Sequence, residues 1–160
     1  MALTKLNNQS LSAVTSAGLP SGSIIGVTTS RFTGTASTNV TTFAGTGHTI
    51  TVTPSSTASK LMIFNLGGAQ TWSQSTNLRI RLYRKIGTGS FTDITGDIGR
   101  IHMNTTYQVP VAFSYTDSPA TTSAVTYEVY IASGAAGSQI WYNGTELDKR
   151  QELTVMEIAG

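Results

Sequence analysis

Short runs of alternating apolar and polar residues follow one another along most of the chain. Alternation of this kind is typical of β-strands, whose successive side chains point to opposite faces of a sheet. The pattern predicts strands over residues 24–32, 48–53, 60–66, 77–86, 107–115, 125–131, 139–142 and 152–158. Turn-forming residues separate these runs, and residues 87–106, rich in Gly, Thr and Asp, predict a loop with short strands.

Three of the predicted strands have distinctive positions. The run Lys60–Leu66 is almost entirely apolar, which predicts a central strand buried on both faces and ended by Gly67 and Gly68. Pro110 cannot donate a ladder hydrogen bond, so residues 107–115 are expected at a sheet edge or at a bulge. The last run is apolar on both faces, because Leu153 and Val155 alternate with Met156 and Ile158.

Composition supports the same fold class. Only 11% of the 160 residues are charged, and Thr, Ser and Gly are abundant while strong helix formers are scarce. About eight short strands predict an all-β fold, an antiparallel two-sheet sandwich, for residues 23–160. Residues 1–22 differ in pattern and end in Gly18-Leu-Pro-Ser-Gly22, so we interpret them as an N-terminal arm joined to the sandwich by a hinge.

The two-faced final strand predicts contact with a second surface, and another copy of the chain is the simplest source of one. Leu153, Val155, Met156 and Ile158 are the predicted contact residues between copies. Tyr127 and Phe113 are expected to support them from the core.

Candidate catalytic chemistry is sparse. The chain has no Cys, and a nucleophilic triad would have to use His48 or His102, neither of which lies in a recognisable motif. Both histidines are therefore expected to be ordinary loop or strand-edge residues. We expect no enzymatic activity, no cofactor and no metal site. Asp93 and Asp97 are predicted to stabilise a turn by accepting hydrogen bonds from nearby backbone amides.

Charge and aromatic residues leave two surface interpretations open. The net charge is only +2, and no apolar run reaches membrane-spanning length, so neither nucleic acid nor a membrane is an expected partner. Arg79 and Arg81 share one strand face, where they either contact an acidic or glycan surface or are simply solvated. Trp72 and Trp141 lie beside short loops and are either exposed contact residues or core residues.

Four segments together resemble a family of virion domains from tailed bacteriophages. They are Ala2–Gly22, Ile50–Leu61 (ITVTPSSTASKL), and Asp117–Tyr127 (DSPATTSAVTY) with Leu153–Ile158 (LTVMEI) at the end. The resemblance implies a jelly roll similar to trimeric complement and tumour-necrosis-factor heads, in which the final strand lies near the threefold axis.

Such domains occur on tail fibres and as capsid decoration proteins. Only about 22 residues precede the sandwich here, whereas a fibre needs a long shaft, and this favours a decoration or cement protein on the virion. The resemblance then implies a homotrimer bound to the major capsid protein, with Leu3, Lys5, Leu6 and Leu11 of the arm as contacts. The alternative is a receptor-binding fibre head that recognises a host glycan.

Overall fold

The computed structural model describes residues 19–71, 75–103, 108–143 and 151–160, and these residues form strands and loops without a helix. The part of the chain so described therefore holds no helix suited to crossing a membrane. The strands are β1 (Ile24–Phe32), β2 (Ala36–Thr38), β3 (Ala44–Val52), β4 (Lys60–Thr71), β5 (Thr76–Ile86), β6 (Thr92–Asp93), β7 (Gly99–Met103), β8 (Gln108–Asp117), β9 (Val125–Ser133), β10 (Ile140–Tyr142) and β11 (Gln151–Ile158).

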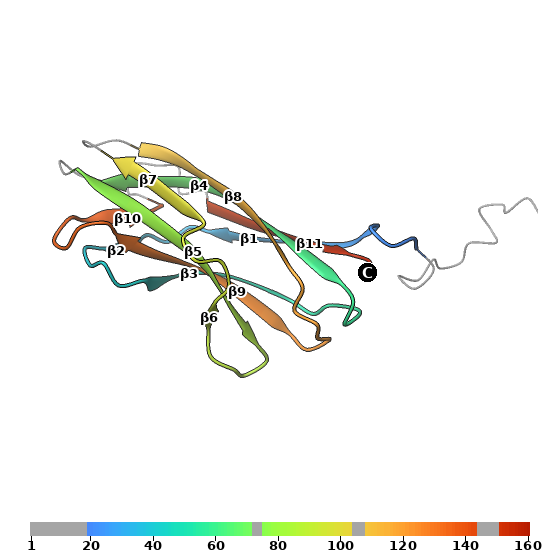
Figure 1. The fold of residues 1–160 in the computed structure, drawn as a ribbon. Helices are drawn as coiled ribbons and strands as arrows, with labels where there is room; N and C mark the ends of the chain where they lie inside the picture. The colour runs from blue at the N-terminus through green and yellow to red at the C-terminus, as the bar shows by residue number, and fades with distance from the viewer. Residues whose placement is uncertain (1–18, 72–74, 104–107, 144–150) are drawn as a thin grey trace, which may run out of the picture.

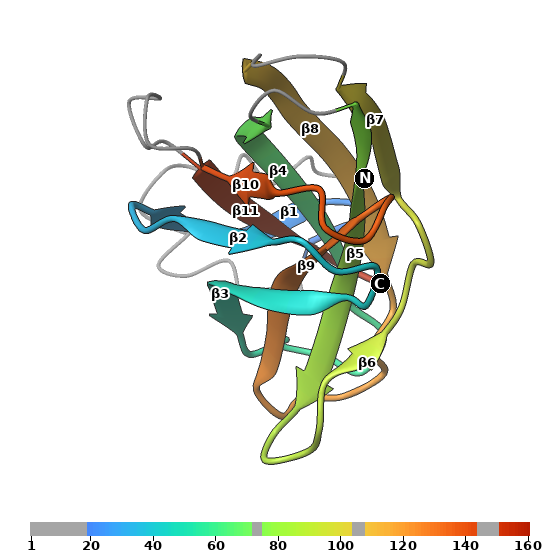
Figure 2. The ribbon, with the colours of Figure 1, turned by 90° about the vertical axis from the view of Figure 1, so that its left-hand side faces the viewer.

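The strands form two antiparallel sheets that pack face to face (Figures 1 and 2). The first, called sheet A here, has the order β1-β11-β4-β8, and the short strands β10 and β2 extend it beyond β11 and β1. Sheet B has the order β3-β9-β5, with β7 and β6 pairing with different parts of β5. Numbered by chain order, the eight main strands read 1-8-3-6 and 2-7-4-5, which is the strand order of a jelly roll. The predicted all-β two-sheet sandwich is confirmed.

The core lies between the sheets and is built from one side of each alternating strand. Sheet A contributes Leu61 and Ile63 of β4, and sheet B contributes Leu78, Ile80 and Leu82 of β5, all of them almost fully buried. Tyr127 of β9 is fully buried and Phe113 of β8 packs against the same cluster, so the predicted core positions of both residues are confirmed.

Two sequence predictions about β4 are wrong. The strand does not end at Gly67 and Gly68 but runs on to Thr71, where it pairs with β10. Gly67 is needed because the Gln151 side-chain amide occupies the space where a Cβ would lie, so this glycine permits close approach and not a turn. The strand is also buried on only one face, and Leu66 on the other face is 65% exposed.

The prediction for the last strand also needs a correction. Leu153 and Val155 of β11 point into the sandwich and are at most 1% exposed in the single chain. They are therefore core residues and have no surface to offer another copy. Met156 and Ile158 lie on the opposite face of β11 and are half-buried. The apolar character of the inner face is thus explained by the second sheet of the same chain.

A buried ionic cluster closes one end of the sandwich. Both carboxylate oxygens of Asp117 lie 2.8 Å from Nη1 of Arg84, and the Tyr127 hydroxyl donates to Oδ2 at 2.7 Å. Burial, together with this bond to Asp117, raises the pKa of Tyr127 well above its ordinary value. The carboxylate of Asp117 is only 7% exposed, and the two partners compensate the loss of its hydration.

The reassignment of β11 makes a stability prediction. Leu153→Ala should lower the free energy of unfolding by about 2–5 kcal/mol, because it removes buried methyl groups and leaves a cavity. Thr154→Ala, one residue along on the outer face, should change it by less than about 0.5 kcal/mol. Urea unfolding followed by circular dichroism measures both, and equal small effects would contradict a core position for Leu153.

Candidate interaction surface

The outer face of sheet A carries apolar side chains on all four of its main strands, with hydroxyl-bearing residues between them. Cross-strand pairs place Val27, Met156 and Met62 in one row and Phe64 beside Thr154 and Ser114 in the next. Ile24 and Ile158 form a further pair. We call this set the apolar face, and it consists of Ile24, Val27, Met62, Phe64, Leu66, Ala112, Met156 and Ile158.

The apolar face is notable because of how far it is exposed. Ile24 and Val27 are each 58% exposed and Leu66 is 65% exposed, and these are three of the five exposed large apolar side chains among the described residues. Scattered single apolar residues are normal on a surface, whereas a contiguous set marks a site of interaction. These residues therefore make the apolar face the principal candidate for binding.

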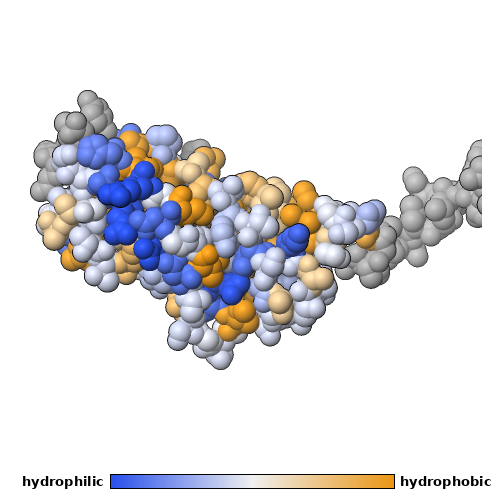
Figure 3. Space-filling view, viewed as in Figure 1, coloured by the Kyte–Doolittle hydropathy of each residue, from blue (hydrophilic) through white to orange (hydrophobic). Residues whose placement is uncertain are grey.

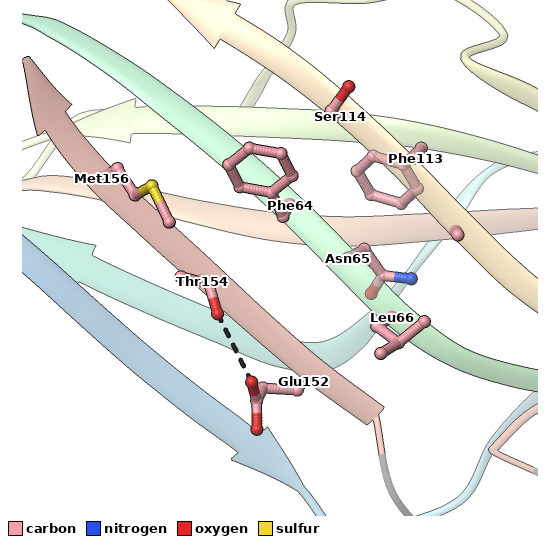
Figure 4. Close-up of a pocket in the computed structure, with 9 residues that line it drawn as sticks. Phe64, Asn65, Leu66, Phe113, Ser114, Glu152, Thr154 and Met156 are labelled. Carbon is pink, nitrogen blue, oxygen red and sulfur yellow. Dashed lines mark hydrogen bonds between the residues drawn. The ribbon is translucent and has the colours of Figure 1, made fainter.

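A shallow hollow of about 580 Å³ lies within the apolar face. Figure 4 shows Phe64 and Leu66 on β4 between Thr154 and Met156 on β11 and Ser114 on β8. The Thr154 hydroxyl lies 3.4 Å from the Glu152 carboxylate at one end of the hollow. The lining is apolar with a few hydroxyls, so the surface suits another apolar surface better than a charged ligand.

Among the residues that the structure describes, the charged ones of this face lie at its two ends. Arg31 and Glu152 lie opposite each other at one end, and Lys60 lies beside Ile158 at the other. Near Lys60, Glu157 accepts hydrogen bonds from Ser55 N, Ser55 Oγ and Ser59 Oγ at 2.7–2.8 Å and so holds the loop between β3 and β4. Burial raises the pKa of Glu157, but these hydrogen bonds outweigh burial and lower it overall.

The outer face of sheet B is polar by contrast. Arg79 and Arg81 of β5 both bind Asp97, with nitrogen–oxygen distances of 2.8 Å, and Arg81 also binds Asp93 at 2.7 Å. Both guanidinium groups lie over the Phe43 ring, at 4.9 and 4.0 Å from its centre. The bonds to the arginines, that from Arg79 first, outweigh burial and lower the pKa of Asp97.

These contacts answer the question left open for Arg79 and Arg81. Their charges are compensated by Asp93 and Asp97, so they form an internal ladder and not a free basic patch. Asp93 also accepts hydrogen bonds from the backbone N–H groups of Thr95 and Gly96, which confirms the predicted turn for Asp93, whereas the Asp97 carboxylate binds the two arginines. Figure 3 shows hydrophilic residues forming a band across the face in view, with single apolar residues between them.

Aromatic rings add a second feature to sheet B. Tyr83 of β5 and Tyr130 of β9 stack with ring centres 3.8 Å apart, and Phe91 lies beside Tyr130. The Lys85 ammonium lies 5.0 Å above the centre of the Phe91 ring. These rings contact each other and neighbouring charges, so the surface is already filled by its own side chains.

Other predicted contact residues are placed as follows. Trp141 of β10 is half-buried and pairs with Gln70 and Ser37, so it is neither fully exposed nor a core residue. Trp72 and the arm residues Leu3, Lys5, Leu6 and Leu11 lie outside the described residues. The structure brings Met156 and Ile158 together on the apolar face and leaves Leu153 and Val155 inside.

Sequence reasoning identified only Met156 and Ile158 among the eight residues of the apolar face. Met62, Phe64 and Leu66 occupy every second position of β4, and their alternation with Leu61, Ile63 and Asn65 was the available signal. The run seemed to be buried on both faces because both alternating sets are apolar. Lys60, which shares the outer face, was the polar residue that marked that face correctly, whereas Asn65 is buried on the inner face and its polarity would have indicated the wrong one.

His48 does lie on an edge strand, β3 of sheet B, but it is not the ordinary surface residue that this position suggested. Its ring is 1% exposed between the two sheets, where Nδ1 lies 2.8 Å from the Tyr142 hydroxyl oxygen and Nε2 lies 3.1 Å from the Ser30 carbonyl oxygen. His102 of β7 is exposed and lies 3.4 Å from the Ser75 hydroxyl. The two histidines are therefore in opposite environments.

Comparisons with known proteins give distant likenesses only. No protein-family model and no curated protein matches the sequence. A chain of the T13 IBDV viral particle shares 10% identity over 86% of this chain, with a TM-score of 0.49. A chain of infectious bursal disease virus Gx strain shares 11% identity over 82%, with a TM-score of 0.45.

The present chain spans little more than a third of the length of either viral chain, at 36% and 37%. Both likenesses are too distant to assign a family or a function.

The paired arginines give a prediction about charge. Asp97→Asn should leave Arg79 without its carboxylate partner and Arg81 with only Asp93, and so expose positive charge on sheet B. The variant should elute from a heparin column at higher salt than the wild type, which should bind weakly. Glu152→Gln makes the same charge change on sheet A and serves as the control. Equal elution of Asp97→Asn and Glu152→Gln would contradict the compensating role of Asp97.

Proposed function

We propose that this chain is a non-enzymatic structural protein of a virion, a capsid decoration or cement protein that binds a phage head as a homotrimer. The observation that carries the proposal is the apolar face of sheet A, on a sandwich whose other outer face carries the ion pairs of Arg79 and Arg81 with Asp93 and Asp97. An apolar surface with charges only at its ends favours a permanent partner of similar character. A second and third copy of the same chain supply such a partner.

The order of the sequence segments that resemble phage virion domains supports the same proposal. The resemblance implies a final strand close to a threefold axis, and in the present chain Met156 and Ile158 of that strand belong to the apolar face. Val27 on β1 and Met62 on β4 lie opposite Met156, and Leu66 lies farther along β4, opposite Glu152. All three would share the contact. We assign the contact between copies to these outward residues and not to Leu153 and Val155.

The start of the described chain is anchored beside its end. Gly22 N donates to Ala159 O at 2.8 Å, and Ala159 N donates to Ser23 O at 2.8 Å. The segment before β1 therefore joins the sandwich at the same end as Ile158 and Lys60. In a trimer formed through the apolar face, three arms would start near one another, which suits attachment to one site on a shell.

The proposed mechanism is mechanical. A protein that binds only the assembled shell shifts the equilibrium towards that state, by an amount set by its concentration relative to its dissociation constant. Three linked arms make the second and third contacts intramolecular, so modest individual affinities give high overall avidity, typically by a factor of about 10²–10⁴. The head would bridge neighbouring capsid subunits while the arms hold the major capsid protein.

Trimer formation gives the first prediction. The wild-type protein should have a mass of about three chains of 16.9 kDa each by light scattering. Leu66→Glu should yield a folded monomer, because it places a charge in the contact without disturbing the core. Val40→Glu changes another exposed apolar residue, 47% exposed and away from the apolar face, and should remain trimeric. A trimeric Leu66→Glu variant would contradict the assigned contact.

Capsid attachment gives the second prediction. Replacing Leu3, Leu6 and Leu11 together with Ser should leave the trimer intact but lower its binding to purified undecorated shells by about 10²-fold or more, because three contacts are lost at once. Co-sedimentation with the shells measures this binding. Unchanged shell binding, combined with loss of host adsorption in Trp141→Ala, would instead support the receptor-binding head that recognises a host glycan.

A further inference from the structure

A chain of polar groups crosses the core from one sheet to the other through His48. His48 of β3 contacts the Ser30 carbonyl oxygen of β1 at 3.1 Å and the Tyr142 hydroxyl of β10 at 2.8 Å. The same hydroxyl lies 2.8 Å from Oδ1 of Asn65 on β4, whose Nδ2 donates to the Val111 carbonyl oxygen of β8 at 3.2 Å. The four contacts thus link sheet B to four strands of sheet A.

The hydrogens available for these four contacts can be counted. Four contacts need four hydrogens, and both ends of the chain are backbone carbonyl oxygens, which only accept. Asn65 supplies one hydrogen to Val111 O and Tyr142 supplies one, so the His48 ring must supply two. A neutral imidazole carries a single N–H, and therefore one contact lacks its hydrogen. The imidazolium form, with two N–H groups, completes all four.

The amide orientation of Asn65 does not remove this shortage. With its oxygen and nitrogen exchanged, Nδ2 would donate to the Tyr142 oxygen, but Oδ1 would then face the Val111 carbonyl oxygen. Two acceptors would again lie at hydrogen-bond distance without a hydrogen between them. One hydrogen is therefore missing in either orientation of the Asn65 amide, as long as His48 is neutral.

The hydroxyl of Tyr142 is the member of the chain that can adapt. It rotates about its C–O bond, whereas the Ser30 carbonyl is fixed by the backbone of β1. In the neutral state His48 Nε2–H donates to Ser30 O, and the Tyr142 hydroxyl turns to donate to Nδ1. In the protonated state Nδ1–H donates to Tyr142, and the hydroxyl turns to donate to Asn65 Oδ1.

We propose that the Tyr142 hydroxyl has two positions and that the protonation state of His48 decides between them. The series of hydrogen bonds from Ser30 to Val111 is therefore an acid-sensitive link between the two sheets. The link goes beyond the proposed function and does not depend on it. Proton uptake changes no covalent bond between heavy atoms. One proton binds to Nδ1 of His48, and the hydroxyl hydrogen of Tyr142 changes its acceptor.

Glu128 of β9 places a carboxylate near His48, but it accepts from Gly47 N at 2.9 Å, whereas both nitrogens of the His48 ring have other partners. Phe32 of β1 stacks on the His48 ring with centres 5.3 Å apart, and Tyr142 is the other titratable group facing it. Arg31 of β1 pairs with Glu152 on the outer side of sheet A, and Lys60 lies at the start of β4, five residues before Asn65. Strands β3 and β10 themselves contain no Asp, Glu, Lys or Arg.

The balance of effects gives the sign of the pH dependence. Burial lowers the pKa of His48 more than the Ser30 carbonyl raises it. The folded protein therefore binds this proton less readily than the unfolded chain does. The contribution of His48 to stability is complete above about pH 6.5 and decreases as the pH falls below that value. The completed hydrogen-bond chain offsets part of the cost of burying the charge.

The test uses Asn65, which affects His48 only through Tyr142. Asn65→Leu keeps the branching and the number of heavy atoms and removes the second acceptor of the Tyr142 hydroxyl. With neutral His48 every remaining contact then has its hydrogen, whereas with protonated His48 the hydroxyl loses its acceptor. The pKa of His48, measured by NMR titration of its ring, should fall by about half a pH unit or more. Thr76→Val removes a buried hydroxyl bonded to Ser133 at 3.0 Å and should leave that pKa unchanged.

A second measurement needs no substitution. In the wild-type protein at neutral pH, the ring nitrogen shifts of His48 should identify the tautomer with hydrogen on Nε2, and exposed His102 serves as the reference. An unchanged pKa in folded Asn65→Leu would overturn the proposal. A neutral tautomer with hydrogen on Nδ1 would overturn it as well, because the hydroxyl would then point to Asn65 at every pH.

Discussion

Alternation of side chains along β4 and β11 is the constraint on which the rest of the molecule depends. Each of these two strands places one set of residues in the core and the other set on the outer surface of sheet A. The inner set, with Leu61, Ile63 and Leu153, is buried by sheet B and stabilises the fold of the single chain. The outer set, with Phe64, Leu66 and Met156, has no such cover within the described residues. One pair of strands therefore serves both folding and the proposed assembly.

The outer faces of the two sheets differ in the side chains that they expose to solvent. Sheet B pairs Arg79 and Arg81 with Asp97 and Asp93 and stacks Tyr83 on Tyr130, so these side chains are held by contacts within the sheet's own surface. Sheet A keeps apolar side chains outward and confines charge to its ends. The difference is difficult to explain for an isolated monomer, because exposed apolar area brings no stability to a single chain. A partner on sheet A explains it directly.

Much of the fold was predictable from the sequence because alternation is a local signal. Strand β1 was predicted with the bounds that the structure has, and Pro110 does lie on β8, the edge strand of sheet A. The errors arose where distant residues decide the outcome. Gly67 belongs inside β4 because Gln151 packs over it, and His48 is buried because Tyr142, 94 residues later, bonds to its ring. Neither contact leaves a trace in the neighbouring sequence.

The candidate site was predictable in part for the same reason. The sequence indicated that β11 has two apolar faces, but it did not say which face the second sheet covers, and Leu153 and Val155 were assigned to the wrong surface. The partners of Arg79 and Arg81 come from a loop whose return to β5 depends on the Asp93 turn. Pairing of charges across a turn follows from three-dimensional proximity, which periodicity does not encode.

Oxidation of methionine side chains in the assembled protein tests the central claim most directly, because sulfur oxidation follows exposure. Met62 and Met156 lie on the apolar face, and Met103 is 2% exposed and serves as the buried reference. If copies associate through this face, Met62 and Met156 should be oxidised slowly in the assembled protein, at a rate close to that of Met103, and much faster after dilution to the monomer. Equal rates in the assembled and diluted protein would show that the apolar face remains open to solvent and would contradict the account.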